Sequence, residues 1–212
     1  MDSHAFPVGA LIAGGRSTRY GATKALEPVR GQRLVDGVAT ALAEATDQVV
    51  LITNETALRD HVDFPARGDR VRGLGPLGGV LTALHWAAEL ERPGILAVAC
   101  DLPFPSAPLL RRIAEIAALG GADAVVPENP GNRRGIEPLF AFYSRSCIEP
   151  IESAISRRDL RMVGFLEEMR LELVPLDEVR RYGDPWRLFF NVNTRADLEL
   201  AERMALLPEA GQ

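Results

Sequence analysis

The sequence predicts an α/β fold in which one doubly wound, mostly parallel sheet carries helices on both faces. Two observations lead to this prediction. Short apolar runs alternate along the chain with stretches whose apolar residues follow helical spacing, and such alternation is typical of parallel sheets. One of these runs, Gly94–Cys100, is apolar without interruption and ends at Asp101, as expected for a central strand that is buried on both faces.

The first half of the chain supplies the core of the predicted sheet. The first strand is Val8–Ile12, a short apolar run with a β-branched residue at each end. Apolar residues at helical spacing then predict a helix over residues 32–45, and the apolar run at 48–53 predicts the second strand. A further helix is expected over residues 77–88, ahead of the central strand.

The second half of the chain is expected to complete the sheet. Strands are predicted at 122–127, 137–143, 171–176 and 189–194, with 171–176 at an edge because its alternation is weak. Helices are predicted over 147–155 and 198–206, and Thr194 and Asp197 are expected to cap the second of these. Because no repeat or linker is visible, residues 1–212 are expected to form one domain, with a core of about 8–206.

Composition excludes several classes of protein. The 212 residues are 47% hydrophobic and 25% charged, with a formal net charge of −5, which argues against a general nucleic-acid or acidic-membrane surface. Cys100 and Cys147 have no metal-ligand spacing and are expected to stay reduced. No signal peptide and no apolar run of membrane-spanning length is visible. We therefore expect a cytoplasmic protein with no membrane or nucleic-acid partner.

The stretch after the first strand combines small residues with positive charge. Ala13, Gly14 and Gly15 let a ligand approach the backbone closely, and successive N–H groups there can bind an anion. No acidic residue occurs between positions 2 and 27, although the whole chain is acidic. The stretch is therefore expected to hold a polyanion; a surface loop that is cationic by chance is the alternative. Its basic residues are Arg16, Arg19 and Lys24.

The spacing of this stretch excludes two common phosphate-binding loops. A Walker A loop would need Gly-Lys-Ser/Thr where Tyr20 stands, and a G-x-G-x-x-G fingerprint does not match glycines at 14, 15 and 21. The remaining pattern, A-G-G-x-S-x-R-x-G-x-x-K, resembles the signature loop of certain nucleotidyltransferases. These enzymes join a nucleoside monophosphate to a phosphorylated acceptor and release pyrophosphate.

Further polar residues follow other predicted strands. Asn54 follows the second strand and Asp101 follows the central strand, at the carboxyl ends where open parallel sheets bind ligands. The glycine-rich turn at 69–79 precedes a helix and suits a phosphate or a stacked base, with a purely structural connector as the alternative. Asp101 is expected to bind Mg²⁺, which prefers one or two carboxylates together with phosphate oxygens. Its alternative role as a helix cap is better served by Ser106.

Four stretches, at 13–24, 69–79, 100–103 and 190–194, agree in order and spacing with one family. Together with Arg158-Asp-Leu-Arg-Met-Val-Gly-Phe165, they resemble the molybdenum cofactor guanylyltransferases, which join GTP and molybdopterin into a guanine dinucleotide cofactor. The resemblance runs from Val8 to Leu200 and implies a Rossmann-like fold of the nucleotide-diphospho-sugar transferase type. It also implies Mg²⁺ as cofactor, GTP and molybdopterin as substrates, and other proteins of molybdenum cofactor biosynthesis as partners.

Two alternative functions stay open at this point. One is a cytidylyltransferase that acts on molybdopterin or on another small phosphorylated acceptor. The other is a catalytically silent nucleotide-binding regulator, against which the presence of both Lys24 and Asp101 argues.

The resemblance implies roles for individual residues. Catalysis falls to Arg19, Lys24 and Asp101, with Asp101 as the metal ligand. Lys24 is expected to be an exposed loop residue, whose replacement lowers turnover and leaves the fold intact. The residues expected to contact the nucleotide are Ile12, Ala13, Gly14, Gly15, Lys24, Asn54, Asp69, Gly75, Pro76, Leu77 and Asp101.

The implied reaction fits these residue types. A terminal phosphate oxygen of the acceptor attacks the α-phosphorus of GTP, and pyrophosphate leaves in line. Because the second pKa of a phosphate monoester is about 6, this nucleophile is already ionised at neutral pH and needs no general base. Catalysis then depends on positioning and on neutralisation of phosphate charge.

The acceptor is expected to bind near the last predicted strand. Asn191 and Asn193 would alternate along that strand, so both carboxamides would face the same side and could read the edge of a pterin or hold its phosphate. Bracing of the neighbouring backbone is the alternative. The resemblance adds Arg161 to the acceptor side. Arg133 and Arg134, in a polar loop, could bind an anionic acceptor or could simply be solvated.

Overall fold

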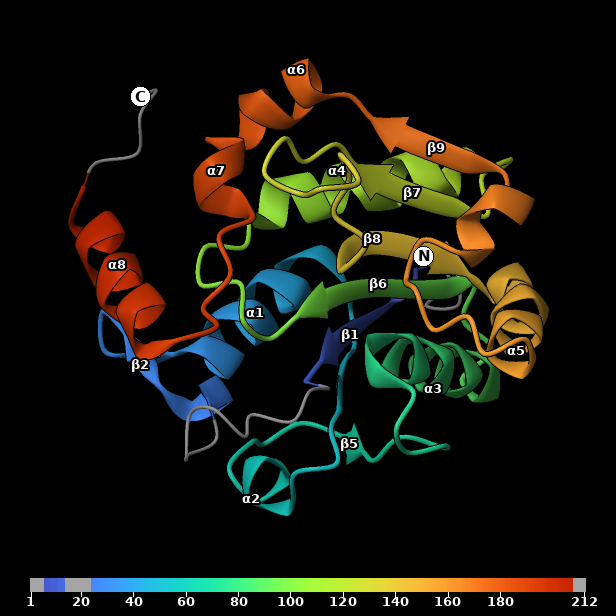
Figure 1. The fold of residues 1–212 in the computed structure, drawn as a ribbon, viewed down its shortest axis with the longest axis horizontal. Helices are drawn as coiled ribbons and strands as arrows, with labels where there is room; N and C mark the ends of the chain where they lie inside the picture. Colours follow the sequence, from blue (N-terminus) through green and yellow to red (C-terminus); the bar gives the residue numbers. More distant parts are fainter. Residues whose placement is uncertain (1–5, 14–23, 208–212) are drawn as a thin grey trace.

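The computed structural model describes residues 6–13 and 24–207, and within them a seven-stranded sheet forms the centre of the molecule (Figure 1). Its strands are β1 (Val8–Ile12), β4 (Val49–Ile52), β5 (Ala66–Arg67), β6 (Gly94–Ala99), β7 (Ala124–Pro127), β8 (Phe140–Ser144) and β9 (Leu171–Val174). From edge to edge their order is β5-β4-β1-β6-β8-β7-β9. β8 is antiparallel to both of its neighbours, whereas the other described pairings in this sheet are parallel.

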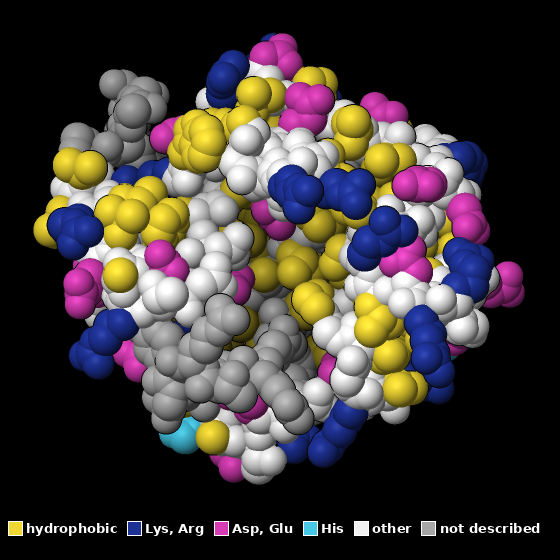
Figure 2. Space-filling view, viewed as in Figure 1, with side chains coloured by type: hydrophobic (Ala, Val, Ile, Leu, Met, Phe, Trp, Pro, Cys, Tyr) yellow, Lys and Arg dark blue, Asp and Glu magenta, His cyan; other side chains and the backbone are white. Residues whose placement is uncertain are grey.

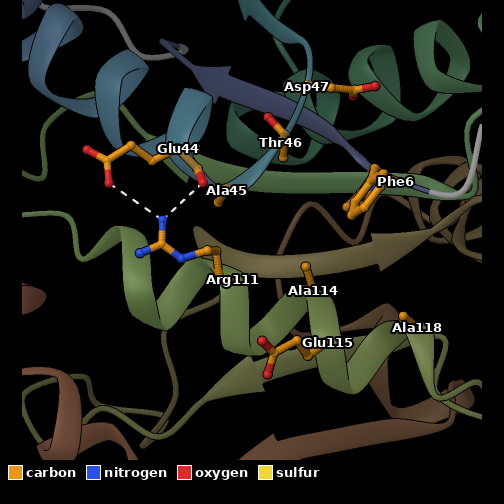
Figure 3. Close-up of a pocket in the computed structure, with 10 residues that line it drawn as sticks. Phe6, Glu44, Ala45, Thr46, Asp47, Arg111, Ala114, Glu115 and Ala118 are labelled. Carbon is orange, nitrogen blue, oxygen red and sulfur yellow. Dashed lines mark hydrogen bonds and ion pairs between the residues drawn. The ribbon is translucent and has the colours of Figure 1, made fainter. Parts of the chain in front are cut away.

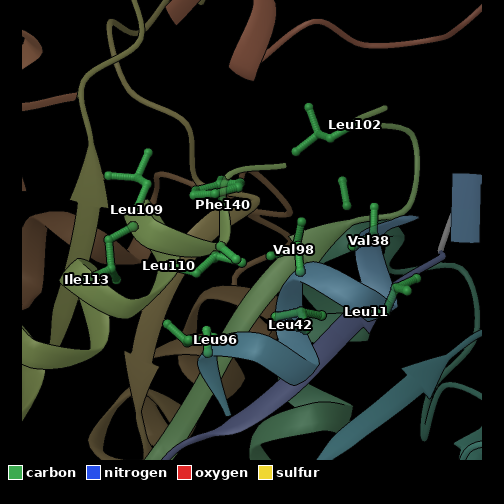
Figure 4. Packing of buried hydrophobic residues seen from close by; sticks show 14 of the residues in the cluster. Leu11, Val38, Leu42, Leu96, Val98, Leu102, Leu109, Leu110, Ile113 and Phe140 are labelled. Atoms are coloured by element: carbon green, nitrogen blue, oxygen red, sulfur yellow. The ribbon is translucent and has the colours of Figure 1, made fainter. Parts of the chain in front are cut away.

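Helices cover both faces of the sheet. Because side chains alternate across a strand, each face has its own buried cluster: Leu11 of β1 packs in one and Ile12 in the other. Figure 4 shows the first cluster, in which Leu42 and Leu110 pack from two helices against the sheet. The helices of that face are α1 (Leu34–Ala45) and α4 (Ala107–Ala118), and those of the opposite face are α3 (Gly75–Glu89) and α5 (Ile148–Ser156).

Smaller elements surround this core. A two-stranded hairpin of β2 (Pro28–Val29) and β3 (Gln32–Arg33) packs against the C-terminal helix α8 (Arg195–Leu206), with Val29 and Ala201 in a shared buried cluster. None of the helices within the described residues combines the length and apolar character that a membrane crossing requires. The remaining short helices are α2 (Thr56–Arg59), α6 (Leu176–Val179) and α7 (Pro185–Leu188), and the 3₁₀ turns are η2 (Lys24–Leu26), η3 (Arg145–Cys147), η4 (Phe165–Glu168) and η5 (Arg180–Tyr182).

Most of the predicted architecture is confirmed. The sheet is doubly wound and mostly parallel, β6 lies within it, and β9 forms one edge. Thr194 caps α8 and Asp197 completes a capping box. The helix predicted over 32–45 begins later, at Leu34, because Gln32 and Arg33 pair with β2 in the hairpin.

The strand predicted at 189–194 is wrong. The backbone donors of this segment are used elsewhere: Val192 N–H donates to the carbonyl of Asp101, and the N–H groups of Asn193 and Thr194 donate to the Asp197 carboxylate. The N–H groups of Phe189 and Phe190 donate to the carbonyls of Pro185 and Arg187, so five of the six residues use their backbone donors outside a strand ladder. The argument that the two asparagines face one side of a strand therefore fails.

Candidate active site

The carboxyl ends of β1, β4 and β6 meet at one edge of the sheet, where open parallel sheets bind their ligands. Asp101 lies just beyond β6, and its Oδ2 accepts a hydrogen bond from Lys24 Nζ at 2.9 Å. The Lys24 and Asp101 side chains are 17% and 22% exposed. The expectation of an exposed loop lysine is therefore wrong, because the pairing with Asp101 holds the Lys24 side chain against the site.

The other carboxylate oxygen of Asp101, Oδ1, is buried and has no hydrogen-bond partner among the described residues. A buried, charged oxygen without a donor is unfavourable unless a cation or another donor meets it. Mg²⁺ fits this position, since it binds through one or two carboxylates plus phosphate oxygens and water. Within the described ranges no three His, Cys, Asp or Glu side chains cluster as metal ligands. Substrate phosphates would therefore have to complete the coordination.

On the β4 side of Asp101, Asn54 and Asp69 form a reciprocal pair. Asn54 Nδ2 donates to Asp69 Oδ2 at 2.6 Å, and the Asp69 backbone N–H donates to Asn54 Oδ1 at 3.0 Å. Burial raises the pKa of the Asp69 carboxyl, although the Asn54 hydrogen bond acts against that shift. A Cβ added at Gly79 of α3 would lie 3.8 Å from Asp69 Oδ1, so the pair lies beside the helix that begins with Gly75 and Pro76.

The predicted nucleotide contacts in β1 and α3 belong mainly to the core. The side chains of Ile12 and Leu77 are 3% and 0% exposed. The Ala13 N–H donates to the carbonyl of Ile52, and the Ile12 carbonyl accepts from Cys100. A nucleotide could reach only the backbone groups that these bonds leave free. The predicted residues Gly14, Gly15 and Arg19 lie outside the described residues.

On the β8 side of Asp101 lies a second carboxylate, Glu137, which is 6% exposed. Because β8 is antiparallel, the residues that precede it lie at the same edge as the carboxyl ends of its neighbours. Asn129 Nδ2 donates to Glu137 Oε2 at 2.9 Å, and the Leu139 N–H donates to Oε1 at 3.4 Å. Burial raises the pKa of Glu137, and the charge of Asp101 adds to that shift. Two acidic groups therefore border the same site.

A pocket of about 420 Å³ opens beside Glu137. Aromatic side chains and amides from two distant segments line it. Figure 2 shows the surrounding face, which is hollowed near the end of β6 and has Lys and Arg side chains on the rim of the hollow. The lining residues of the pocket are Asn129, Gly131, Asn132, Arg133, Glu137, Pro185, Trp186, Phe189, Phe190 and Asn191.

Of the three residues predicted to bind the acceptor, Asn191 lines this pocket. Asn193 is exposed, and its backbone belongs to the cap of α8. Arg161 is exposed and forms an ion pair of 2.6 Å with Asp159. Among the described residues, no hydrogen bond or ion pair joins Arg161 to either asparagine.

Another pocket, of about 520 Å³, lies between α1 and α4 near the start of β1 (Figure 3). Its lining is mostly apolar, and Arg111 closes one side by donating to the Glu44 carbonyl at 3.0 Å. It holds none of the predicted site residues and lies at the opposite end of β1 from Asp101. We assign it no part in the reaction.

Residues 9–171 match the family model of the MobA-like NTP transferase domain, which is more than half of the chain. The chain belongs to this family. A probable molybdenum cofactor guanylyltransferase from Pelotomaculum thermopropionicum is 35% identical over 199 residues, or 93% of this chain and 92% of that protein. The molybdenum cofactor guanylyltransferase of Syntrophotalea carbinolica is 29% identical over 92% of this chain and 90% of its own length. As a member of the MobA-like family, the chain is a nucleotidyltransferase.

Solved structures agree on the fold. Molybdopterin-guanine dinucleotide biosynthesis protein A from Archaeoglobus fulgidus superposes with a TM-score of 0.79 at 24% identity, covering 93% of this chain and 98% of its own. A Mycobacterium tuberculosis protein in complex with manganese gives a TM-score of 0.65 at 18% identity, over 93% and 98% of the two chains. At these identities the likeness extends to the fold alone.

Glu137 and Trp186 are among the lining residues of the pocket of about 420 Å³ that the sequence did not predict as site residues. The sequence predicts Glu137 inside a strand. Only the antiparallel direction of β8 shows that it lies at the same edge of the sheet as the carboxyl ends of β1, β4 and β6. Trp186 is 63% exposed in α7, an element that the sequence did not predict. The sequence signal that could have indicated Trp186 is a tryptophan directly after Asp-Pro, a pair typical of a helix start.

Proposed function

We propose that this chain transfers GMP from GTP to the terminal phosphate of molybdopterin, releasing pyrophosphate and forming the guanine dinucleotide cofactor. The observation that carries the proposal is Asp101, with Lys24 on one oxygen and no described partner on the other, at the ligand-binding edge of a nucleotidyltransferase. The names of the relatives supply the substrates. We also propose that residues 1–212 act as one domain, in the cytoplasm.

Lys24 would neutralise charge on the phosphates of GTP. Its ammonium group is already held at the site by Asp101, so little conformational freedom is lost when a phosphate replaces water there. Arg19 and the amides of Gly14 and Gly15, which precede Lys24 in the sequence, are proposed to bind the same phosphates.

Asp101 would hold a divalent cation through Oδ1, the oxygen that lacks a described donor. The manganese complex of the Mycobacterium tuberculosis protein supports a divalent metal, and we propose Mg²⁺ as the physiological ion. When bound, Mg²⁺ supplies charge neutralisation and orientation of the reacting phosphates. Asp101 Oδ2 meanwhile keeps Lys24 in position.

The acceptor phosphate would act as nucleophile without help from a protein base. A phosphate monoester has its second pKa at about 6 and is largely ionised at neutral pH. The remaining task is to hold its oxygen in line with the bond from the α-phosphorus to the leaving pyrophosphate. Val192 N–H donates to the Asp101 carbonyl, and we propose that the neighbouring Asn191 and Asn193 help to hold the acceptor there.

The nucleotide is proposed to lie on the β4 side, against Asn54, Asp69 and the start of α3 at Gly75 and Pro76. The preference for guanine rests on the names of the relatives, because no contact among the described residues selects a base. A cytidylyltransferase is therefore the rival that an experiment must exclude. Other proteins of molybdenum cofactor biosynthesis stay predicted partners.

The deciding assay incubates the protein with Mg²⁺ and molybdopterin, with GTP, CTP or ATP in parallel, and identifies the dinucleotide by mass. We expect the guanine dinucleotide, at a rate at least tenfold above the others. Asp101→Asn should abolish the product. A cytosine dinucleotide as main product would favour the rival, and no dinucleotide with any nucleotide would refute the proposed transfer.

A further inference from the structure

The pocket beside Glu137 combines a buried negative charge with aromatic walls. Glu137 is 6% exposed and lines the pocket together with Asn129. Its carboxylate accepts hydrogen bonds from Asn129 Nδ2 and the Leu139 N–H, and the Asn132 side chain also hydrogen-bonds to it. Because two carboxylate oxygens can together accept four hydrogen bonds, the carboxylate retains capacity for a further donor.

Part of the pocket lining is aromatic. Phe189 is 5% exposed and fixed by an edge-on contact with Phe140, with ring centroids 5.6 Å apart. Trp186 is 63% exposed, and a Cβ added at Gly131 would lie 3.0 Å from its ring. The indole is thus held at its edge by the loop and leaves most of its surface free. A flat heterocycle could stack on it.

These features match one kind of ligand. A buried carboxylate with a free acceptor position is complementary to an amino group, and the 2-amino-4-oxopyrimidine ring presents one at its position 2. Both guanine and pterin contain this ring. Arg133, on the rim of the pocket, adds a cation for a phosphate.

The order of the strands favours pterin over guanine. Asp101 follows β6, with β1 and β4 on one side and β8 on the other. Asn54 and Asp69 lie on the β4 side, whereas Glu137 and the pocket lie on the β8 side. With the nucleotide on the β4 side, the pocket is left for the acceptor.

We propose that Glu137 selects the acceptor by accepting a hydrogen bond from the 2-amino group of its pterin, while the ring stacks on Trp186. This inference rests on the proposed function for the identity of the acceptor. Glu137 is thus a specificity residue.

The test measures binding without chemistry, by titration calorimetry. The probes are the phosphate of 6-hydroxymethylpterin and its lumazine counterpart, in which a carbonyl replaces the 2-amino group. Wild type should bind the pterin roughly tenfold to a hundredfold more tightly, as expected for a hydrogen bond to a charged group. Glu137→Gln should remove most of that preference. Trp186→Ala should lower the affinity for both probes by about the same factor, so the preference for pterin over lumazine should stay unchanged.

A second pair of ligands distinguishes the two sources of the same ring. GTP and ITP differ by the 2-amino group, and Glu137→Gln should leave their affinity ratio unchanged. If the variant removes the GTP preference and keeps the pterin preference, Glu137 reads guanine and the proposal is overturned. Equal affinity of the wild type for the pterin and lumazine probes would also overturn the proposal. This comparison uses the wild-type protein alone and so does not depend on the folding of a variant.

Matched controls exclude general damage. Glu172→Gln on the exposed face of β9 and Leu119→Ala, 82% exposed beyond α4, should change none of these affinities. Because the titrations need no turnover, a protein that discriminates pterin but makes no dinucleotide would refute the proposed function alone. If the protein makes the dinucleotide and the Glu137→Gln variant keeps the full preference for pterin over lumazine, this inference alone is refuted.

Discussion

Replacing Lys24 by methionine tests how firmly the site is built before any substrate binds. The pair with Asp101 has a 2.9 Å contact between side chains that are 17% and 22% exposed. Its gross attraction at an effective dielectric constant of about 20 is about 6 kcal/mol, most of which desolvation offsets. Breaking fully buried pairs costs about 3–5 kcal/mol and exposed pairs about 0–1 kcal/mol. This pair lies between them, so we expect Lys24→Met to destabilise the fold by about 2 kcal/mol.

That loss corresponds to a fall in melting temperature of about 4–8 °C for a chain of this size. The assay is thermal unfolding of wild type, Lys24→Met, Asp101→Asn and the double variant, with a coupling of at least about 1 kcal/mol expected between the two sites. Arg157→Ala serves as control, because its ion pair with Glu168 is more than half exposed and should contribute little. Additive effects of the two site variants would refute the reasoning, since additivity means that the pair does not form in solution.

Further predictions concern the metal, the fold and pH. Asp101→Asn should weaken Mn²⁺ binding measured by paramagnetic resonance at least tenfold, and an unchanged titration would remove Asp101 from the metal site. Gly94→Ala should destabilise the fold by about 3 kcal/mol in urea, because the added Cβ would lie 2.2 Å from the Tyr143 carbonyl; Gly37→Ala, whose nearest neighbour would be 3.8 Å away, is the tolerated control. Hydrogen bonds from Arg170 hold the pKa of Asp123 well below its ordinary value, so this carboxylate stabilises the fold above about pH 4 and loses that contribution as pH falls further. Melting temperatures should therefore drop more steeply below pH 4 in wild type than in Asp123→Asn, and parallel curves would contradict this.

The sequence predicted the parts of the site that depend on local order along the chain. A strand followed by glycines and a carboxylate after an apolar run are both local signals, and Asp101 lies where they predict it. The sequence predicts Lys24 in the site but does not predict that its side chain is partly buried. Its partner, Asp101, lies 77 residues away, and the pair forms only in the folded chain.

The errors arise where tertiary contacts decide. The segment at 189–194 has a strand-like composition, yet Asp101 and Asp197 take its backbone donors. The place of Glu137 at the ligand-binding edge could not be predicted, because the residues of a strand do not show whether it runs parallel or antiparallel to its neighbours. A carboxylate that precedes a parallel strand would lie at the edge of the sheet opposite to Asp101. Because β8 is antiparallel to β6, the carboxylate that precedes it lies at the same edge as Asp101.

The proposed transfer of GMP from GTP to a molybdopterin phosphate depends on Asp101 and Lys24. Lys24 is the only lysine in the 212-residue sequence, so an amine-reactive GTP dialdehyde can label the site at a single side chain. The most direct measurement is a single turnover with molybdopterin and Mg²⁺, using GTP labelled in its α-phosphate or, separately, in its γ-phosphate. We expect the α-label in the dinucleotide and the γ-label in pyrophosphate, with both signals lost after labelling of Lys24. The γ-label in the acceptor product, or full turnover by protein labelled at Lys24, would contradict it.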